Sequence, residues 1–293
     1  MMGGRIVKFL TKMLGVEKIK VRFSDEMLWK KFNSKLTVIS TMISLLLIGI
    51  TIPNEWKAIA GIGVFVILFI LYVSMWVSAN RMTKVELNIN NSTVHVKLGD
   101  VFAESGLKVI SFNEYFDTRV DDTLISRRSL NGQYIENLVT DIDELNRLID
   151  TNQSLENKII SIANDRIIGN KKQYKLGTIF KHNDYLLTAF SKFDQDNRAY
   201  LSMNDYINCL MNFWNEVDII YNGQTITIPL LGSGITRFKD YPVTEQELLE
   251  LLLWTFKVSR VKFTYPAHIS IVIQDEKKDK INFYKLRGVE NGL

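Results

Sequence analysis

A glycine-rich segment that follows an apolar one contains the residue types best suited to ligand chemistry in this sequence. Thr225–Pro229 is β-branched and aliphatic and follows the turn-forming pair Asn222–Gly223, so a buried strand is predicted. The residues after it are Leu231, Gly232, Ser233, Gly234, Ile235, Thr236 and Arg237. Glycines at 232 and 234 allow a positive φ, successive amides can form a concave nest for phosphate oxygens, and the Arg237 guanidinium can bind the same anion. The segment predicts a phosphate-binding loop, although an ordinary strand-to-helix turn has a similar composition.

Two further predicted strands also end in polar and aromatic residues. Lys84–Ile89 and Ser92–Lys97 alternate around Asn90-Asn91 as a hairpin, and Leu107–Phe112 is an apolar strand. In an α/β sheet, ligands bind outside the carboxyl ends of the strands. The candidate ligand contacts there are Asp100, Val101, Phe102, Asn113, Glu114, Tyr115 and Asp117. The alternatives are a turn aspartate at 100, solvated or helix-capping acids at 114 and 117, and a core aromatic at 115.

Metal and catalytic chemistry receive little support from the sequence. The three histidines (His95, His182 and His268) stand alone, so no zinc site is predicted. Asp194–Asp205 has some acids of a calcium loop, but Arg198 occupies a ligand position and Ala199 replaces the required glycine. The single cysteine, Cys209, lies in an apolar helical pattern typical of a buried thiol in a reducing compartment. We therefore predict no metal site and no catalytic residue.

Two uncharged apolar segments near the N-terminus predict a membrane hairpin within residues 36–78. Residues 36–52 (Leu36–Ile52) form a run of about 17 residues, and 58–77 (Ala58–Val77) a run of about 20. A spanning helix needs about 20 apolar residues. Pro53–Lys57 connects the two, and Trp56, Tyr72 and Trp76 are placed as interfacial aromatics would be. A core hairpin of a soluble protein is the alternative.

Charge is concentrated before this hairpin, in a basic segment of residues 1–35. That segment contains nine Lys or Arg against three Asp or Glu, a net +6, so the rest of the +4 chain carries −2. This distribution favours anionic lipid headgroups and argues against nucleic acid as a partner. Gly4–Gly15 is either a short interfacial amphipathic helix or a frayed one. Lys30, Lys31 and Lys35 precede the hairpin, and Arg81 and Lys84 follow it. Positive residues on both sides predict a multi-pass protein with cytoplasmic N- and C-termini.

The sequence predicts a cytosolic α/β domain at residues 83–288. Strands alternating with helices predict a mixed central sheet with helices on both faces. The expected helices are Tyr134–Asn152, Asn204–Val217 and the segment that begins at Thr244 with the capping-box residue Glu247. Lys175–Phe193 is expected to form a strand hairpin, Ser129–Gln133 a flexible loop, and His268–Ile273 and Lys280–Leu286 the two strands that close the sheet.

These segments also resemble a known family. Leu98–Phe102 resembles the Gly-Asp-Ile/Leu segment of macro domains, whose aspartate recognises the adenine amino group of ADP-ribose. Asn113 stands where macro domains carry an asparagine-rich loop, and Pro229–Ile235 resembles their second phosphate-binding loop. Taken together, Phe112–Thr118 and Pro229–Phe238 are similar to the membrane-anchored macro-domain effectors of Thoeris anti-phage systems.

That resemblance implies a cytosolic macro domain that senses an ADP-ribose derivative, such as histidine-ADP-ribose made by a partner TIR-domain protein. It also implies anchoring in the bacterial inner membrane, assembly into a homo-oligomer, membrane disruption and no cofactor beyond the signal. Hydrolytic macro domains carry Asn-Ala-Ala-Asn before a run of glycines, whereas Asn113 precedes Glu114-Tyr115-Phe116-Asp117 and Gly132 stands alone. This departure argues against hydrolysis and suggests that Glu114 or Asp117 pairs with a cationic or imidazole group on the ligand. A membrane-bound ADP-ribosyl hydrolase and a constitutive scaffold remain the alternatives.

Overall fold

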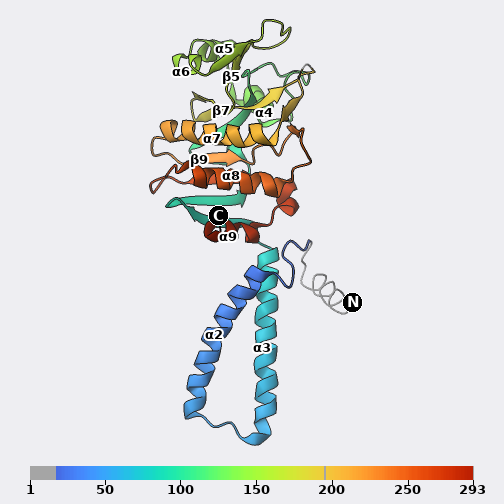
Figure 1. Ribbon diagram of the computed structural model, residues 1–293, viewed down its shortest axis with the longest axis vertical. Helices are drawn as coiled ribbons and strands as arrows, with labels where there is room; N and C mark the ends of the chain where they lie inside the picture. Colours follow the sequence, from blue (N-terminus) through green and yellow to red (C-terminus); the bar gives the residue numbers. More distant parts are fainter. Residues whose placement is uncertain (1–17, 195, 293) are drawn as a thin grey trace. The chain divides into compact units, whose positions relative to one another are not determined.

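The computed structural model describes residues 18–194 and 196–292, and the chain divides into two compact units (Figure 1). The helical unit contains Met1–Thr83 with Asn282–Gly288, and the α/β unit contains Lys84–Ile281 with Val289–Leu293. The α/β unit covers most of the predicted domain 83–288, but the last residues of that range belong to the helical unit. The predicted amphipathic helix at Gly4–Gly15 and the first half of the basic segment lie outside the described residues.

Two long helices form the hairpin of the helical unit. α2 (Glu26–Gly49) begins at Asp25, whose side chain accepts a hydrogen bond from the Leu28 amide, and α3 (Asn54–Asn80) follows Pro53. α3 extends beyond its predicted apolar segment at both ends, whereas α2 begins before residue 36 but ends before Ile52, and the connection between the helices is shorter than Pro53–Lys57. By length and composition, each helix is able to cross a membrane.

An aromatic cluster packs the base of this hairpin. The buried members are Val21, Leu28, Phe32, Tyr72, Trp76, Ala79 and Tyr284. The Trp76 indole donates to the Val21 carbonyl at 2.9 Å, and the Tyr72 hydroxyl donates to the Phe23 carbonyl. Tyr72 and Trp76, expected as interfacial aromatics, are therefore interior residues, because their polar atoms find backbone partners within the unit.

A nine-stranded mixed sheet organises the α/β unit, as the sequence predicts. Its strands are β1 (Lys84–Ile89), β2 (Ser92–Leu98), β3 (Leu107–Asn113), β6 (Ile179–His182), β7 (Tyr185–Phe193), β8 (Ala199–Leu201), β9 (Ile226–Pro229), β10 (Arg237–Phe238) and β11 (Ile269–Ile273). The order is β1-β2-β11-β9-β3-β7-β8-β10, with β6 also paired to β7. Neighbours among β2, β11, β9, β3 and β7 are parallel, so their carboxyl ends meet at one edge.

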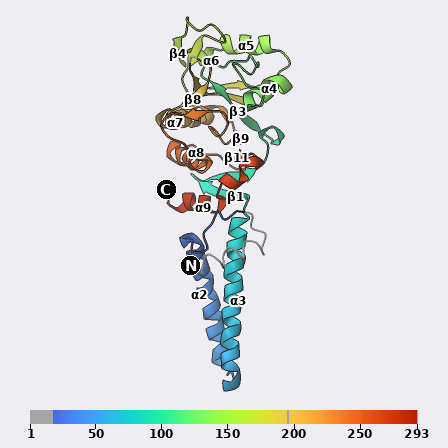
Figure 2. The same ribbon diagram turned by 90° about the vertical axis from the view of Figure 1, so that its right-hand side faces the viewer.

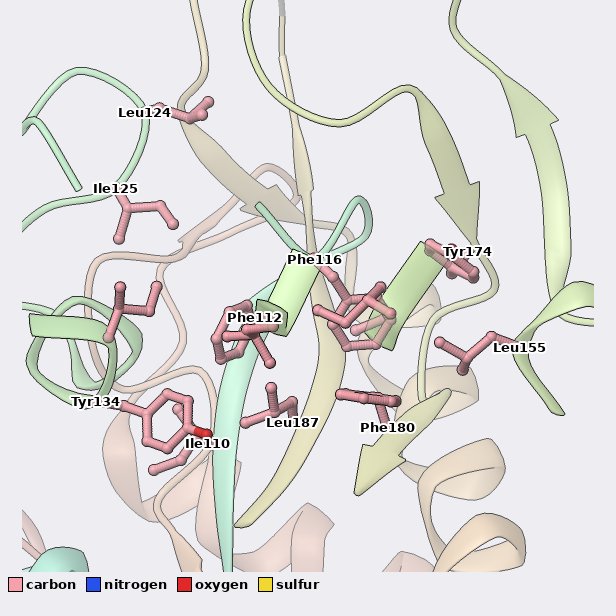
Figure 3. Packing of buried hydrophobic residues seen from close by; sticks show 14 of the residues in the cluster. Ile110, Phe112, Phe116, Leu124, Ile125, Tyr134, Leu155, Tyr174, Phe180 and Leu187 are labelled. Carbon is pink, nitrogen blue, oxygen red and sulfur yellow. The ribbon is translucent and has the colours of Figure 1, made fainter. Parts of the chain in front are cut away.

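Helices cover both faces of this sheet, as Figure 2 shows for α7 and α8 on one side and α4 on the other. The helices are α4 (Leu130–Leu138), α7 (Met203–Ile220) and α8 (Glu245–Ser259). Ile110 and Phe112 of β3 pack with Tyr134 of α4 in a buried cluster (Figure 3). On the α7 side, Cys209 is fully buried, and burial raises the pKa of its thiol, as expected of a structural cysteine. The α8 capping box of Thr244 and Glu247 is present as predicted.

The predictions for residues 129–152 were partly wrong. Ser129–Gln133 is not a loop, because the Ser129 hydroxyl caps α4 by accepting the Gly132 amide at 3.2 Å. The expected single helix Tyr134–Asn152 is two helices, since Asp141 caps a new one through the Glu144 amide. The second helix, α5 (Ile142–Asp150), begins a small layer that continues with α6 (Gln153–Glu156), β4 (Ile159–Ile162) and β5 (Lys172–Tyr174).

The C-terminal predictions were also partly wrong. β11 lies between β2 and β9 rather than closing the sheet. The segment Lys280–Leu286 is not a strand: the 3-10 helix η2 (Asp275–Lys280) precedes the helix α9 (Phe283–Gly292). The Asn282 side chain accepts the Lys285 amide at 3.1 Å, so an N-cap, rather than the apparent alternation, decides the conformation.

Candidate functional site

A cleft opens at the edge where the parallel strands end. Its cavity volume is about 160 Å³. The segments that follow β2, β3, β9 and β11 all contribute to its lining, as expected of a ligand site in a sheet of this kind. The predicted residues that line it are Asp100, Val101, Asn113, Leu231, Gly232, Ser233, Gly234, Ile235 and Thr236. Four strand ends that are far apart in the sequence thus meet at one cleft.

The glycine-rich loop after β9 forms one wall. Gly232 has a φ of +82°, whereas Gly234 is not among the residues with positive φ, so only one of the two predicted left-handed glycines is present. A Cβ on Gly232 would lie 3.3 Å from the Phe238 ring, but one on Gly234 would meet open space. The Ser233 hydroxyl donates to the Leu230 carbonyl at 2.6 Å, which holds the turn. Gly234 therefore lines the cleft with open space beside its Cα.

A lysine from another segment holds this loop in place. The Lys277 amine of η2 donates to the Ser233 hydroxyl at 2.8 Å and to the Ser233 carbonyl. Lys277 also lines the cleft, and burial lowers the pKa of its amine, with the Glu245 carboxylate acting in the opposite direction. A partly desolvated cation beside a glycine-rich loop is well placed to bind a phosphate.

Asp100 lines the cleft at the exit of β2. One of its carboxylate oxygens accepts the Phe102 amide at 3.0 Å and thereby caps the 3-10 helix η1 (Val101–Ala103). The second oxygen is left for a donor in the cleft, such as an exocyclic amino group. Phe102 itself does not line the cleft, because its ring packs against the hydrophobic cluster on this face of the sheet.

The N-terminus of α4 supplies another wall with a second cation. Arg128, Ser126, Ser129 and Asn131 line the cleft, and a helix N-terminus favours anions. The neighbouring Arg127 instead pairs with Asp122 and Glu136 at 2.8 and 2.9 Å. Arg237, the cation predicted from the sequence, is exposed on β10 and does not line the cleft. Its expected place beside the loop is taken by Lys277.

Asn113 connects the cleft to a buried polar network behind it. The Asn113 amide nitrogen donates to Asp117 at 2.7 Å, and its oxygen accepts the backbone amides of Tyr115 and Asp117. The Asp117 carboxylate is fully buried and forms an ion pair with Arg166 at 2.6 Å. It also accepts the Asn170 amide at 2.7 Å. Every polar atom of the Asn113 side chain is thus bonded within the protein.

Glu114 and Tyr115 also belong to this network rather than to the cleft lining. The Glu114 carboxylate accepts the Gln173 side-chain amide at 2.8 Å and the Phe193 backbone amide at 3.2 Å. Burial raises the pKa of Glu114, and the Gln173 hydrogen bond opposes that effect. The Arg166 guanidinium lies 3.9 Å over the Tyr115 ring. The structure therefore separates Glu114, Tyr115 and Asp117 from the other candidates, because the turn after β3 directs these side chains away from the cleft.

Several cleft residues were not predicted from the sequence, namely Ser126, Arg128, Ser129, Asn131, Ser191, Gln274 and Lys277. One sequence feature could have indicated Lys277: it comes just after a predicted strand, where α/β folds place ligand contacts. No sequence feature indicates Arg128, because its place in the cleft depends on where α4 packs. Within residues 18–194 and 196–292, no three His, Cys, Asp or Glu side chains are grouped to hold a metal ion.

Comparison with known proteins identifies the family of this chain. The model of the family "Thoeris protein ThsA, Macro domain" matches residues 94–274. The chain is 47% identical over 220 residues to Thoeris protein ThsA of Bacillus amyloliquefaciens (strain Y2), covering 72% of this chain and 73% of that protein.

Solved macrodomain structures from Oceanobacillus iheyensis are more distant. A mutant has a TM-score of 0.49 at 12% identity over 72% of this chain and 100% of that one. A second mutant, with ADPR, has a TM-score of 0.45 at 11% identity over 70% and 96%. The family model and the Bacillus relative carry the assignment on their own. The chain therefore belongs to the Thoeris ThsA family, and its α/β unit to the macro domain of that family.

Proposed function

We propose that this chain is an anti-phage defence effector whose cleft binds an ADP-ribose-type signal. The observation that carries the proposal is the meeting of the glycine-rich loop, Lys277 and Asp100 at the carboxyl edge of one parallel sheet. The loop and the lysine suit a pyrophosphate, and the free Asp100 oxygen suits the adenine amino group. The macro domain of the matched family supports the same ligand class.

The signal we favour is histidine-ADP-ribose or a related conjugate made by a TIR-domain protein. The appended group would extend toward Asn113 and the N-terminus of α4. Glu114 and Asp117 are occupied by Gln173 and Arg166, so the group meets Arg128 and hydroxyl side chains before it meets a carboxylate. An appended group with an anionic part, such as the carboxylate of an amino acid, fits these residues best.

A signal-binding role is better supported than hydrolysis. The Asn113 oxygen already accepts two backbone amides and its nitrogen donates to Asp117, so the side chain is held by the protein and has one N–H left for a ligand. Hydrolysis also needs a general base within hydrogen-bond reach of that water. Among the described residues, the only carboxylate that lines the cleft is Asp100, which we assign to the adenine. We therefore favour a receptor that keeps its ligand intact.

The helical unit is the proposed membrane anchor, with both termini in the cytoplasm and the membrane being the bacterial inner one. Only 6% of the most apolar window of either helix is buried, whereas the core helix of a soluble protein is mostly buried. Large side chains such as Ile48, Phe65 and Ile67 are exposed along both helices. Lipid would cover this surface, and assembly of several copies after signal binding would disrupt the membrane.

The test uses the full chain in lipid nanodiscs and isothermal titration with ADP-ribose and histidine-ADP-ribose. We expect saturable binding, tighter for the conjugate, and an Asp100→Ala variant weakened by about 10-fold, or about 1.4 kcal/mol. Mass spectrometry of the recovered ligand should show it unchanged. Absence of binding by both compounds would overturn the proposal, and steady hydrolysis would make the chain an enzyme instead. Ligand-dependent leakage of liposomes tests the membrane role separately.

A further inference from the structure

The chain passes between the two units three times, and one of these crossings lies a few residues along the chain from a residue of the cleft. α3 leads into β1 between Thr83 and Lys84, and η2 leads into α9 between Ile281 and Asn282. Lys277, which lines the cleft, is five positions before Asn282 in the sequence. A displacement of η2 therefore has only a few residues of chain in which to be absorbed.

At the α/β end of this connection, η2 is fastened by two lysines. Lys277 donates to Ser233 of the glycine-rich loop, and Lys280 forms an ion pair with Glu245 at the start of α8. The Lys277 amine therefore binds the protein's own carbonyl and hydroxyl oxygens beside the wall where a pyrophosphate would bind. A charged phosphate oxygen is a stronger acceptor for an ammonium group than these neutral oxygens. A phosphate in the cleft would therefore compete with Ser233 for the Lys277 amine.

At the helical end, the same segment is bonded into the base of the hairpin. The Asn282 side-chain amide donates to the Lys20 backbone carbonyl at 2.8 Å. Tyr284 is 4% exposed and belongs to the aromatic cluster with Tyr72 and Trp76. Its buried hydroxyl has no hydrogen-bond partner within the described part of the chain, which is unfavourable for a buried polar group. The packing of α9 on the hairpin therefore leaves one buried polar group unpaired.

We propose that Lys277 is the residue through which ligand binding is coupled to the helical unit. On this account, the amine exchanges the Ser233 oxygens for phosphate oxygens, η2 shifts, and Asn282 and Tyr284 change their packing on the base of the hairpin. The inference rests on the proposed function and adds its regulation. The ligand can shift this equilibrium only by the difference between its affinities for the two positions of η2. Lys277 is therefore a positioning residue as well as a ligand contact.

Hydrogen exchange of the full chain in nanodiscs, with and without saturating histidine-ADP-ribose, tests this coupling. In the unmodified chain we expect changed protection at Asn282–Gly288. Lys277→Met should bind about 10-fold more weakly and, at saturation, show no change in α9. The matched control is Lys278→Met, on the same 3-10 helix but outside the cleft lining, and it should respond as the unmodified chain does.

A second variant separates coupling from binding. Insertion of Gly-Ser-Gly-Ser between Ile281 and Asn282 should preserve ligand affinity and the ligand-free exchange of α9, yet abolish the response of α9 to ligand. A full α9 response in the saturated Lys277→Met variant or in the insertion variant would overturn the coupling while leaving the proposed function intact. Failure of the unmodified chain to bind either ADP-ribose or histidine-ADP-ribose would overturn both.

Discussion

The cleft and the buried network behind it begin at the same strand end but use polar residues in opposite ways. In the network, Asn113, Asp117 and Arg166 satisfy one another, and the Asp117 side chain is fully buried. In the cleft, Asp100 keeps a free carboxylate oxygen, and Gly234 faces open space. Buried polar groups that are fully bonded stabilise a fold, whereas groups with unused bonding capacity are available to a ligand.

The comparison shows that a polar residue at a strand end is not by itself a ligand contact. Both sets of residues follow strands of the same parallel sheet, and both were predicted to bind the ligand. Only the direction of each side chain after its turn separates them. Phe116, in the turn that leads to Asp117, has a φ of +51° and is fully buried, so this backbone is constrained by packing.

The largest expected effect is on stability, from Asp117→Ala. The variant leaves the Arg166 guanidinium largely buried without its partner and removes the acceptor of the Asn113 and Asn170 donors. Breaking a buried pair in this way costs about 3–5 kcal/mol. Chemical denaturation of the full chain in detergent measures it, with the exposed Asp165→Ala as the control, expected within about 0.5 kcal/mol. Normal stability with lost ligand binding would instead place Asp117 in the binding site.

The two loop glycines separate stability from binding. Gly232→Ala places a Cβ at φ +82° near Phe238 and Tyr206, which should cost about 1–2 kcal/mol of stability. Gly234→Ala meets open space, so its stability should change by less than about 0.5 kcal/mol while its affinity for ADP-ribose falls. Thermal unfolding and titration of both variants measure the two effects. Equal affinity of Gly234→Ala and the unmodified chain would contradict a ligand position against this loop.

The adjacent arginines test the charge of the cleft. Arg128→Ala should weaken ADP-ribose binding by about 10-fold, or about 1.4 kcal/mol, and reduce its dependence on salt. Arg127→Ala breaks exposed ion pairs with Asp122 and Glu136, so affinity should be unchanged and stability should fall by no more than about 1 kcal/mol. Titrations at two salt concentrations distinguish the variants. The opposite ranking would mean that the loop presents Arg127 to the ligand.

The smallest effect concerns the pH dependence of stability. Burial raises the pKa of Glu114, so the folded state binds a proton more tightly than the unfolded state. Protonation of Glu114 therefore stabilises the folded state. This stabilisation is fully present below the unfolded pKa of about 4.3, and it is lost as the pH rises through the raised folded pKa. Glu114→Gln should remove this fall and gain stability at neutral pH, with Gln173 turning its amide to match. Denaturation curves from pH 4 to 8 measure it, and a loss at neutral pH would contradict it.

The sequence by itself determined several local conformations and the family. Asparagines at 90 and 91 specify the β1–β2 turn, Thr244 and Glu247 cap α8, and the two uncharged segments form long helices. These features depend on interactions between residues that are close together in the sequence, so sequence patterns are enough to predict them. The glycine-rich loop and the segment around Asp100 were sufficient to indicate the macro domain.

Tertiary structure alone decided which of the predicted residues share a cleft. The order β2-β11-β9-β3 brings Asp100, Gly232 and Lys277 together, although they lie far apart in the sequence. The packing of α4 adds Arg128, and the turn after β3 removes Glu114 and Asp117 to the interior. Strand order and helix packing arise from the burial of side chains that are distant along the chain, so no local pattern specifies which polar groups are left facing solvent.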